Sequence, residues 1–428
     1  MKATGKKIRY STGDRIFDII VLLVMLIVLL ICLYPLYFIM IASISDPYLV
    51  SAGKVFLIPK GISFNAYERI FAYKKIWSGY LNTFIYTGVG TTINVVITVA
   101  AGFPTTVACI VQFGAVPVFV DMNIEESNLD TTQLEAALSP KTKAVMVAHS
   151  LGNPFNLEAV VAFCKKHNLW LVEDNCDALG SEYFIDGEWK KTGTIGDIGT
   201  SSFYPPHHMT MGEGGAVYTN NHELDKYVKS FRDWGRDCWC VGGVDNTCGC
   251  RFTGQFGKLP QGYDHKYVYS HLGYNLKATD MQAAIGCAQL EKLDFIVSRR
   301  RENYQTMYDG LKGTPGLLLP EPQKNSKPSW FGFFVTVKED AGYTRNELTS
   351  YLEEHQVQTR NLFAGNLLMH PAFEEYVEGK DYRTVGDLPV TTSIMKNCFW
   401  LGVYPGMTPE KLQYMIKTIK DFVASKTK

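Results

Sequence analysis

Apolar runs of strand-like composition alternate with helical patterns from about residue 103 of this 428-residue chain. The strand-like runs cover residues 116–121, 143–149, 169–174 and 198–204. Helical patterns lie between the early runs, and Asp130 is placed to cap the first of these helices. Alternating strands and helices predict a mainly parallel sheet, which gathers ligand-binding groups beyond the carboxyl ends of its strands. We therefore expect an α/β domain whose site lies where the third and fourth runs end.

A stretch that carries Pro and Gly at residues 312–329 indicates a domain boundary. The pattern before it predicts one long helix over residues 274–311. The pattern after it predicts a strand and a closing helix. We therefore expect a large domain over residues 103–312 and a smaller α+β domain over residues 313–428.

Residues 19–44 form 26 consecutive positions without a charged side chain. Because a membrane-spanning helix needs about 20 such residues, we predict a span at about residues 17–44, with a buried core helix as the alternative. A second uncharged stretch, richer in Thr and Gly, predicts a weaker span at about residues 80–101. Basic residues before the first run favour a cytoplasmic N-terminus. We therefore expect the chain at the cytoplasmic membrane, with everything after about residue 102 facing the cytoplasm.

The charged and sulfur-bearing residues narrow the classes of partner. Lys plus Arg and Asp plus Glu number 42 each, so no excess of basic charge indicates a nucleic-acid partner.

Four of the ten cysteines lie within residues 238–250. In a reducing compartment such a group favours metal or redox chemistry over disulfides. The spacing is not that of the usual zinc pairs, since 61 residues separate Cys176 from Cys238 and seven separate Cys240 from Cys248.

Polar side chains that suit a phosphorylated cofactor follow two of the predicted strands. Asp174 comes just past a buried strand, where a carboxylate can hold a positive ring nitrogen of a pyridoxal-type cofactor; a capping Asp is the alternative. Ser202 and the glycines after it suit a phosphate. His207 stands five residues after Ser202, where a Schiff-base lysine is common. An imidazole cannot form that bond, but it can accept and return a proton. The cofactor would then stay in its amine form, unless the histidine is merely structural.

The segments "EDNCDALGS", "SFYPPHHMTMGEGGAVYT", "SFRDWGRDCWC" and "GYDHKYVYSHLGYNLKATDMQAA" resemble the CDP-4-keto-6-deoxyglucose 3-dehydrases of the DegT/DnrJ/EryC1/StrS aminotransferase superfamily. The resemblance runs from about residue 96 to the C-terminus. It implies a homodimer of the pyridoxal-phosphate-dependent transferase fold type I that uses pyridoxamine 5'-phosphate and a two-iron two-sulfur cluster. In the implied reaction, a CDP-linked 4-keto-6-deoxy sugar loses its C3 hydroxyl, His207 takes a proton from cofactor atom C4′, and an NADH-dependent iron–sulfur flavoprotein reductase supplies electrons. The product serves dideoxysugar and lipopolysaccharide O-antigen biosynthesis.

The same resemblance assigns roles to residues near the cofactor. Asp174 pairs with the pyridine nitrogen, and Asp177 and Tyr204 lie beside the ring. Ser202 holds the phosphate, with Asn275 reaching across the dimer. These roles are expectations for the site at the strand ends.

The resemblance also implies the ligands of the cluster. They are Cys176, Cys238, Cys240 and Cys248. Cys250 is an extra thiol beside this set, so the choice between Cys248 and Cys250 stays open.

The N-terminal part departs from this pattern. Residues 1 to about 102 resemble the start of a sugar ABC transporter permease, and the two resemblances overlap at "VITVAAG" (residues 96–102). We therefore interpret the chain as a chimera whose fold type I domain is truncated at its N-terminus and lacks the family's phosphate-binding turn. Two alternatives are a sugar aminotransferase, for which Lys190 and Lys191 lie well upstream of the turn, and a non-catalytic membrane-tethered chimera.

Overall fold

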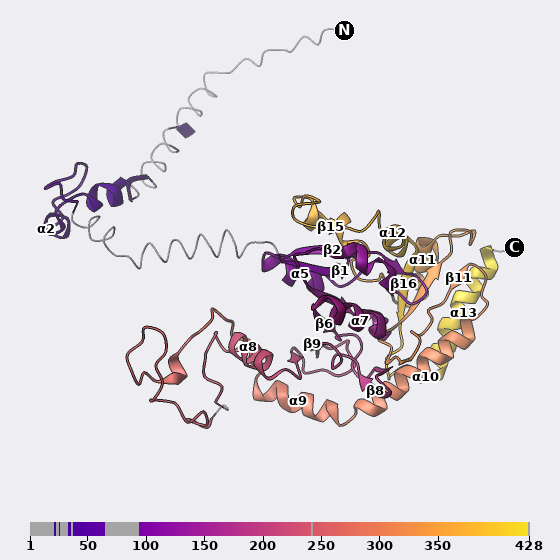
Figure 1. The fold of residues 1–428 in the computed structure, drawn as a ribbon. Coiled ribbons are helices and arrows are strands. Elements are labelled where there is room, and N and C mark those ends of the chain that lie inside the picture. Colours follow the sequence, from indigo (N-terminus) through magenta and orange to yellow (C-terminus); the bar gives the residue numbers. More distant parts are fainter. Residues whose placement is uncertain are drawn as a thin grey trace, which may run out of the picture. The chain divides into compact units, whose positions relative to one another are not determined.

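The computed structural model describes residues 21–22, 25, 33–35, 37–64, 94–240 and 243–426. The chain divides into two compact units, Met1–Thr92 and Ile93–Lys428. Figure 1 follows the chain through both units by its colour.

The first unit contains a helical stretch at residues 37–43 and the short helix α2 (Pro47–Ser51). Asp46 caps α2, because its carboxylate accepts a hydrogen bond from the Tyr48 backbone N–H at 2.8 Å. The Tyr37 hydroxyl donates to the Leu57 carbonyl at 2.6 Å, which ties the helical stretch to the loop after α2.

Half of the span predicted at residues 17–44 and most of the span predicted at residues 80–101 fall on residues that the structure does not describe. Within the described residues, no helix has both the length and the apolar character that crossing a bilayer requires. The described end of the span predicted at residues 80–101 is a β-strand, β1 (Val95–Val99), so the prediction is wrong there. The reason is the β-branched run "VVITV", which favours an extended backbone that pairs with strands on both sides.

A seven-stranded sheet forms the centre of the second unit. Its order is β10-β9-β6-β5-β1-β2-β15, with every neighbouring pair parallel except the antiparallel edge pair β10 and β9. Besides β1, its strands are β2 (Val116–Val120), β5 (Thr142–Ala148), β6 (Trp170–Asp174), β9 (Ile198–Ser202), β10 (Gly215–Tyr218) and β15 (Arg383–Thr384). The four predicted strands are thus confirmed as β2, β5, β6 and β9.

Helices connect the parallel strands and bury the apolar side chains of the sheet. Those of this part are α5 (Pro104–Gln112), α6 (Leu134–Ala137), α7 (Leu157–His167) and α12 (Pro389–Asn397), while α8 (His222–Arg232) follows the edge strand β10. Asp130 caps the turn before α6, as predicted, by accepting from the Thr132 backbone N–H at 2.9 Å. The central core includes Ile97, Val145 and Phe155, each fully buried.

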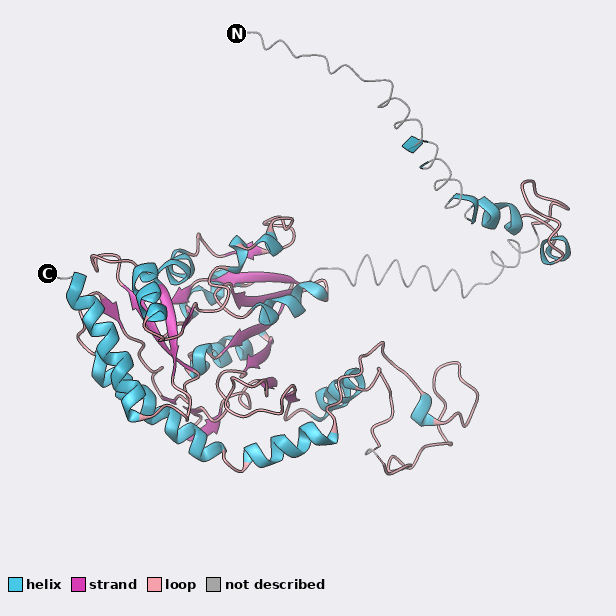
Figure 2. Ribbon diagram, turned by 180° about the vertical axis from the view of Figure 1, so that it is seen from behind, coloured by secondary structure: helices cyan, strands magenta, loops and turns pink. Residues whose placement is uncertain are grey.

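A second, antiparallel sheet has the order β11-β13-β16-β14. Its strands are β11 (Leu317–Leu318), β13 (Gly332–Val337), β14 (Thr359–Arg360) and β16 (Cys398–Gly402), and it packs with α11 (Arg345–Glu354) and α13 (Pro409–Lys426). Figure 2 shows α13 beside the long α10 (Leu293–Leu311), whose C-terminal half contributes to the same apolar core.

Smaller elements complete the unit. They are the sheets β3 (Met122–Asn123) with β4 (Asn128–Leu129) and β12 (Ser326–Lys327) with β7 (Glu182–Ile185) and β8 (Glu188–Lys191), and the 3-10 turns η1 (Thr131–Gln133), η2 (Ser150–Gly152), η3 (His265–Tyr267), η4 (Leu367–Met369) and η5 (Pro371–Phe373).

The single helix predicted over residues 274–311 is wrong, because two helices, α9 (Asp280–Leu290) and α10, occupy this region. Thr279 forms a capping box with Gln282, so α9 starts at Asp280. Lys292, with φ −100° and ψ 0°, then leaves the helical conformation and separates the two helices. Between α8 and α9 the chain projects from the sheets as a segment of turns, the thiol loop (residues 233–279), which Figure 1 shows plainly.

Candidate active site and thiol loop

Asp174 ends β6 and is held there by hydroxyl and amide donors. Its Oδ2 accepts from the Thr106 hydroxyl at 2.7 Å, and its Oδ1 accepts from the Cys176 backbone N–H at 3.2 Å and the Thr200 hydroxyl at 3.4 Å. The side chain lines a cleft of about 1660 Å³ at this edge of the sheet. The predicted carboxylate is therefore present and oriented, and two of its partners, Thr106 and Thr200, were not foreseen from the sequence.

His207 and Asp177 face one another in this cleft. His207 Nδ1 lies 3.5 Å from Asp177 Oδ1 but has no hydrogen-bond partner. Burial, helped by the negative charge of Asp174, raises the pKa of Asp177 to about 8. Burial lowers the pKa of His207 to about 4, an effect that Asp174 opposes and Arg300 increases. At neutral pH the contact therefore joins a protonated carboxyl to a neutral imidazole rather than an ion pair, and the imidazole is free to accept a proton.

The second histidine of the pair, His208, has a different environment. It is only 2% exposed, and its Nε2 lies 3.3 Å from the Ser329 carbonyl oxygen. Burial holds the pKa of His208 well below its usual range. Both rings line the cleft, but only His207 faces a carboxyl group there.

Arg300 on α10 fixes the turn that carries the histidines. The guanidinium donates to the Phe331 carbonyl at 3.0 Å and to the Pro206 carbonyl at 3.3 Å. The ring of His207 lies against Phe331, with 5.1 Å between ring centroids. Burial lowers the pKa of Arg300 to about 10, so the side chain stays charged at neutral pH. A long-range contact from α10, which sequence reasoning missed, thus sets the position of His207.

Ser202 and Tyr204 line the same cleft, whereas Asn275 does not. The Ser202 hydroxyl accepts from the Tyr204 backbone N–H at 3.3 Å. The Tyr204 side chain is 48% exposed, and its ring centroid lies 6.4 Å from that of His207. Asn275 is exposed at the base of the thiol loop, where its backbone pairs with Asp233.

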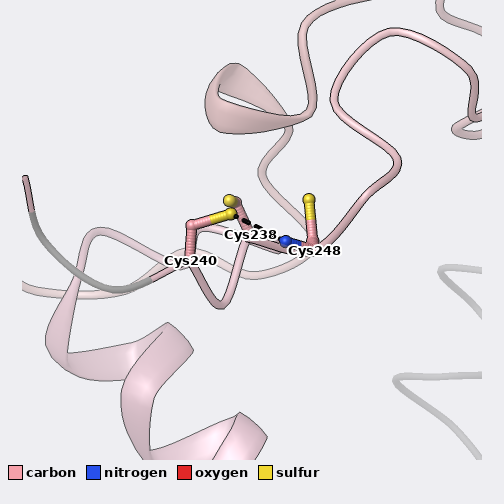
Figure 3. Close-up of side chains that lie close together, drawn as sticks. All are labelled: Cys238, Cys240 and Cys248. Atoms are coloured by element: carbon pink, nitrogen blue, oxygen red, sulfur yellow. Dashed lines mark hydrogen bonds between the residues drawn. The ribbon is translucent and has the colours of Figure 1, made fainter. Parts of the chain in front are cut away.

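Three of the four predicted cluster ligands come together in the thiol loop. The sulfur atoms of Cys238, Cys240 and Cys248 lie within 4.8 Å of one another. Figure 3 shows the three side chains and the hydrogen bond that the Cys248 backbone N–H donates to Cys240 Sγ at 3.4 Å. Hydrogen bonding, chiefly from Thr247, lowers the pKa of Cys240 to about 6. A thiol with this pKa is largely a thiolate at neutral pH, the form that binds metals.

The fourth predicted ligand lies elsewhere. Cys176 follows β6 and lines the cleft, where its sulfur is 4.0 Å from the Thr200 hydroxyl. Burial and the neighbouring Asp174 raise the pKa of this thiol. Cys176 belongs to neither of the two groups of metal-ligand atoms among the described residues; the second group is Cys248, Cys250 and His265.

A further buried carboxylate, Glu173, lies next to Asp174 in β6. It accepts from His149 Nε2 at 2.9 Å and from the backbone N–H groups of Gly193 at 2.7 Å and Ile195 at 2.8 Å. Glu173 and His149 are both fully buried. The sequence held one signal for this arrangement, a charged residue inside the apolar run 169–174, since a buried charge requires partners.

A mainly parallel sheet with its site at the carboxyl ends of the strands, joined to a smaller antiparallel sheet, is the architecture of pyridoxal-phosphate-dependent transferases of fold type I. The model of the DegT/DnrJ/EryC1/StrS aminotransferase family matches residues 83–420. The chain belongs to this family.

Similar proteins of this family include two curated relatives and a solved structure. The lipopolysaccharide biosynthesis protein RfbH of Salmonella typhimurium is 55% identical over 328 residues, 76% of this chain and 73% of the relative. The dTDP-4-dehydro-2,6-dideoxy-D-glucose 3-dehydratase of Saccharopolyspora spinosa is 50% identical over 329 residues, 77% of this chain and 70% of the relative. The structure of the E. coli GDP-4-keto-6-deoxy-D-mannose-3-dehydratase with bound hydrated PLP superposes with a TM-score of 0.66 at 26% identity, covering 77% of this chain and 80% of that one.

Proposed function

We propose that this protein is a sugar-nucleotide 3-dehydratase of deoxysugar biosynthesis that works with pyridoxamine 5'-phosphate on a CDP-linked 4-keto-6-deoxy sugar. The observation that carries the proposal is the imidazole of His207, which lines the cleft beside Asp177. The family resemblance puts the Schiff-base lysine of aminotransferases at this position. The dehydratase names of several relatives support the same reaction class.

The residues of the cleft fit this cofactor. A buried carboxylate, Asp174, and a hydroxyl, Ser202, both line the cleft, and His207 Nδ1 is a buried polar atom without a partner. When bound, pyridoxamine phosphate supplies the amine that condenses with the keto group of the sugar and a ring that acts as an electron sink.

Side chains of the protein would bind the cofactor and transfer the protons. Asp174 holds the positive charge at the ring nitrogen, and Ser202 binds the phosphate. His207 takes the C4′ proton and returns one to the departing hydroxyl, because its lowered pKa leaves it unprotonated before the reaction. Asp177 would be a positioning residue, since its carboxyl group lies 3.5 Å from Nδ1 of the imidazole.

The proposal includes an iron–sulfur cluster in the thiol loop. Cys238, Cys240 and Cys248 would hold it, and their separations of at most 4.8 Å fit thiolates that share one metal centre. The cluster supplies single electrons, and an NADH-dependent iron–sulfur flavoprotein reductase would be the partner that delivers them. A homodimer would bring Asn275 of each subunit toward the other's cleft.

The first unit would serve as a membrane anchor. Residues 1–92 would attach the enzyme to the cytoplasmic membrane as a permease-like segment, with the cleft on the cytoplasmic side. Fractionation of cells that produce the full chain tests this part, because recovery of all the protein in the supernatant after ultracentrifugation would contradict it.

The second candidate function, sugar aminotransfer, needs a lysine beside the cofactor. Lys190 and Lys191 lie on β8, where they pair with Asp186 at 3.2 Å and Glu182 at 2.7 Å. Neither lines the cleft. This observation removes both residues as candidates for that lysine.

The test is anaerobic turnover of the purified full chain with pyridoxamine phosphate, the CDP-linked 4-keto-6-deoxy sugar, a chemical reductant and reconstituted iron and sulfide. We expect loss of the C3 hydroxyl, followed by nuclear magnetic resonance of the sugar. Amino transfer to C4 of the sugar, together with a borohydride-stable cofactor adduct on a lysine, would establish the aminotransferase instead.

A further inference from the structure

Two consecutive carboxylates end β6, and they differ in the donors that surround them. Glu173 is fully buried, and each of its oxygens accepts two hydrogen bonds. The donors to Oε1 are the backbone N–H groups of Ile195 and Gly196, and the donors to Oε2 are His149 Nε2 and the backbone N–H of Gly193. An ionised carboxylate offers about four acceptor positions. Glu173 is therefore saturated by the protein itself.

The donor set of Asp174 is less complete. Its Oδ1 accepts from the Cys176 backbone N–H at 3.2 Å and the Thr200 hydroxyl at 3.4 Å, whereas its Oδ2 accepts from the Thr106 hydroxyl at 2.7 Å. The Cys176 thiol, a weak donor, also lies near this carboxylate. Among the described residues, one acceptor position on Oδ2 is thus left without an N–H or O–H donor, and the Asp174 side chain lines the cleft.

Thr106 holds Oδ2 in an unusual way for a threonine in a helix. It lies in the first turn of α5 and is 5% exposed. Threonine hydroxyls in helices commonly bond to a backbone carbonyl three or four residues earlier, but this hydroxyl donates to a side chain 68 residues away. Valine has nearly the same shape and would fill a buried helix position equally well. Packing alone therefore does not explain the hydroxyl group.

We propose that Thr106 is a positioning residue, whose hydroxyl fixes the Asp174 carboxylate so that the open acceptor position on Oδ2 faces a cationic ring N–H group in the cleft. The two longer bonds both fall on Oδ1, so they hold one end of the carboxylate, and Thr106 holds the other end. The class of ligand is a protonated aromatic nitrogen heterocycle. Its identity as the cofactor ring rests on the proposed function, whereas the alignment of Asp174 by Thr106 does not.

The first experiment needs no cofactor. Crystal structures of the cofactor-free full chain are compared for the wild type, Thr106→Val and Thr106→Ser. Thr106→Val removes the donor and keeps the volume, so we expect the Asp174 carboxylate to turn about its Cβ–Cγ bond. Thr106→Ser keeps the donor and should keep the orientation. A carboxylate with the wild-type orientation in Thr106→Val would overturn the inference.

The second experiment uses pyridoxamine 5'-phosphate labelled with nitrogen-15 in the ring and follows its resonance on the full chain at fixed pH. Thr106→Val should shift the ring nitrogen toward its unprotonated value and raise the dissociation constant about tenfold, since a hydrogen bond to a charged group usually contributes this much. Thr106→Ser should restore the wild-type resonance. A role in folding alone would not move this resonance, and circular dichroism shows whether each variant is folded.

The matched control is Thr105→Val. Thr105 precedes Thr106 on α5 and also lines the cleft, but its side chain is exposed. Its variant should keep the wild-type resonance and dissociation constant. If Thr105→Val and Thr106→Val changed both quantities equally, the effect would belong to α5 as a whole and the inference would be wrong.

Asp174→Asn separates this inference from the proposed function. If the ring resonance responds to Asp174→Asn but not to Thr106→Val, the proposed cofactor site stands and the inference fails. If it responds to neither variant although the carboxylate has turned in crystals of Thr106→Val, the alignment by Thr106 stands and the proposed cofactor site is wrong.

Discussion

The cleft and the thiol loop position chemically active side chains in two different ways. In the cleft, Asp174 and Ser202 end buried parallel strands, and His207 sits on a turn fixed by the buried Arg300. The thiol loop has turns and bridges among its described residues but no strand, and its ligands are placed by one another and by the stacking of His265 on Phe256.

The difference appears in the pKa values. Burial dominates in the cleft, where it raises the pKa of Asp177 to about 8 and lowers that of His207 to about 4. In the loop, hydrogen bonds lower the pKa of Cys240 to about 6, whereas burial raises that of Cys238 to about 11. The cleft thus keeps Asp177 and His207 neutral for proton transfer, whereas the loop offers an anionic thiolate at Cys240 for a metal. Rigid scaffolding suits the first task, and a loop that closes around an ion suits the second.

The largest expected effect separates the proton chemistry of the cleft from the metal binding of the thiol loop. His207→Asn should lower the rate of C4′ proton exchange by about 10²- to 10⁴-fold, because it removes the proton acceptor. Exchange is measured in deuterated water with pyridoxamine phosphate and the keto sugar. The metal content of the thiol loop should not change.

A matched control is His167→Asn, on the surface at the end of α7, where His167 contacts Glu135 at 3.1 Å. Its exchange rate should equal that of the wild type. An unchanged rate in His207→Asn would remove His207 from its proposed role.

The next largest effect concerns stability and tests whether the buried pair of Glu173 and His149 stabilises the fold around the cleft. Glu173→Gln should lower the free energy of unfolding by about 3 kcal/mol, since it leaves the fully buried His149 without its carboxylate partner. Urea denaturation of the purified chain measures this change. Glu135→Gln, which breaks a surface pair with Lys166, should change stability little. Equal effects in the two variants would mean that the buried pair is not a support of the site.

Sequence reasoning reached the strands and the cleft residues because both follow from local pattern. Alternating apolar runs predict β2, β5, β6 and β9, and the polar residues that end β6 and β9 meet in one cleft for the topological reason expected of parallel sheets. Contacts between residues far apart in the sequence cannot be predicted from a local pattern. Thr106 reaches Asp174 from 68 residues away, and Arg300 reaches the Pro206 carbonyl from 94 residues away.

In the thiol loop, the sequence predicted part of the group of ligand atoms and missed the rest. The family resemblance predicted that Cys238, Cys240 and Cys248 gather, and the structure brings them together. The same resemblance includes Cys176 and gives no signal for His265, and a histidine 15 residues after Cys250 has no distinctive spacing. Only the folded loop shows which imidazole faces the thiols. The predicted long helix over residues 274–311 failed for a related reason, since a capping box at Thr279 competes with helical periodicity.

A smaller effect concerns pH and the cofactor-free cleft. The pKa of Asp177 is about 8 in the folded protein and about 3.9 in an unfolded chain. The folded state therefore binds this proton more tightly, and the stability it contributes is present below pH 4 and is lost as pH rises toward 8. Relative to Asp177→Asn, the wild type should lose about 1.4 kcal/mol per pH unit within that window. Urea denaturation at pH 5, 6 and 7 measures this slope, and a stability difference that does not vary with pH would contradict the raised pKa.

The smallest effect should be confined to the loop. Arg251 joins its two sides by donating to Asp264 at 3.0 Å and Asp245 at 3.1 Å. The pair with Asp245 is exposed and the pair with Asp264 is only partly buried, so salt and solvent weaken both. Arg251→Met should therefore leave the urea midpoint of the chain unchanged but speed proteolytic cleavage within residues 233–279, because local opening depends on few contacts. Lys417→Met, which breaks an exposed pair with Asp421 on α13, is the matched control and should change neither quantity. If Arg251→Met lowered the midpoint as much as Glu173→Gln, the loop and the cleft would unfold as one cooperative unit, and the contrast between a rigid cleft and a separately closing loop would be wrong.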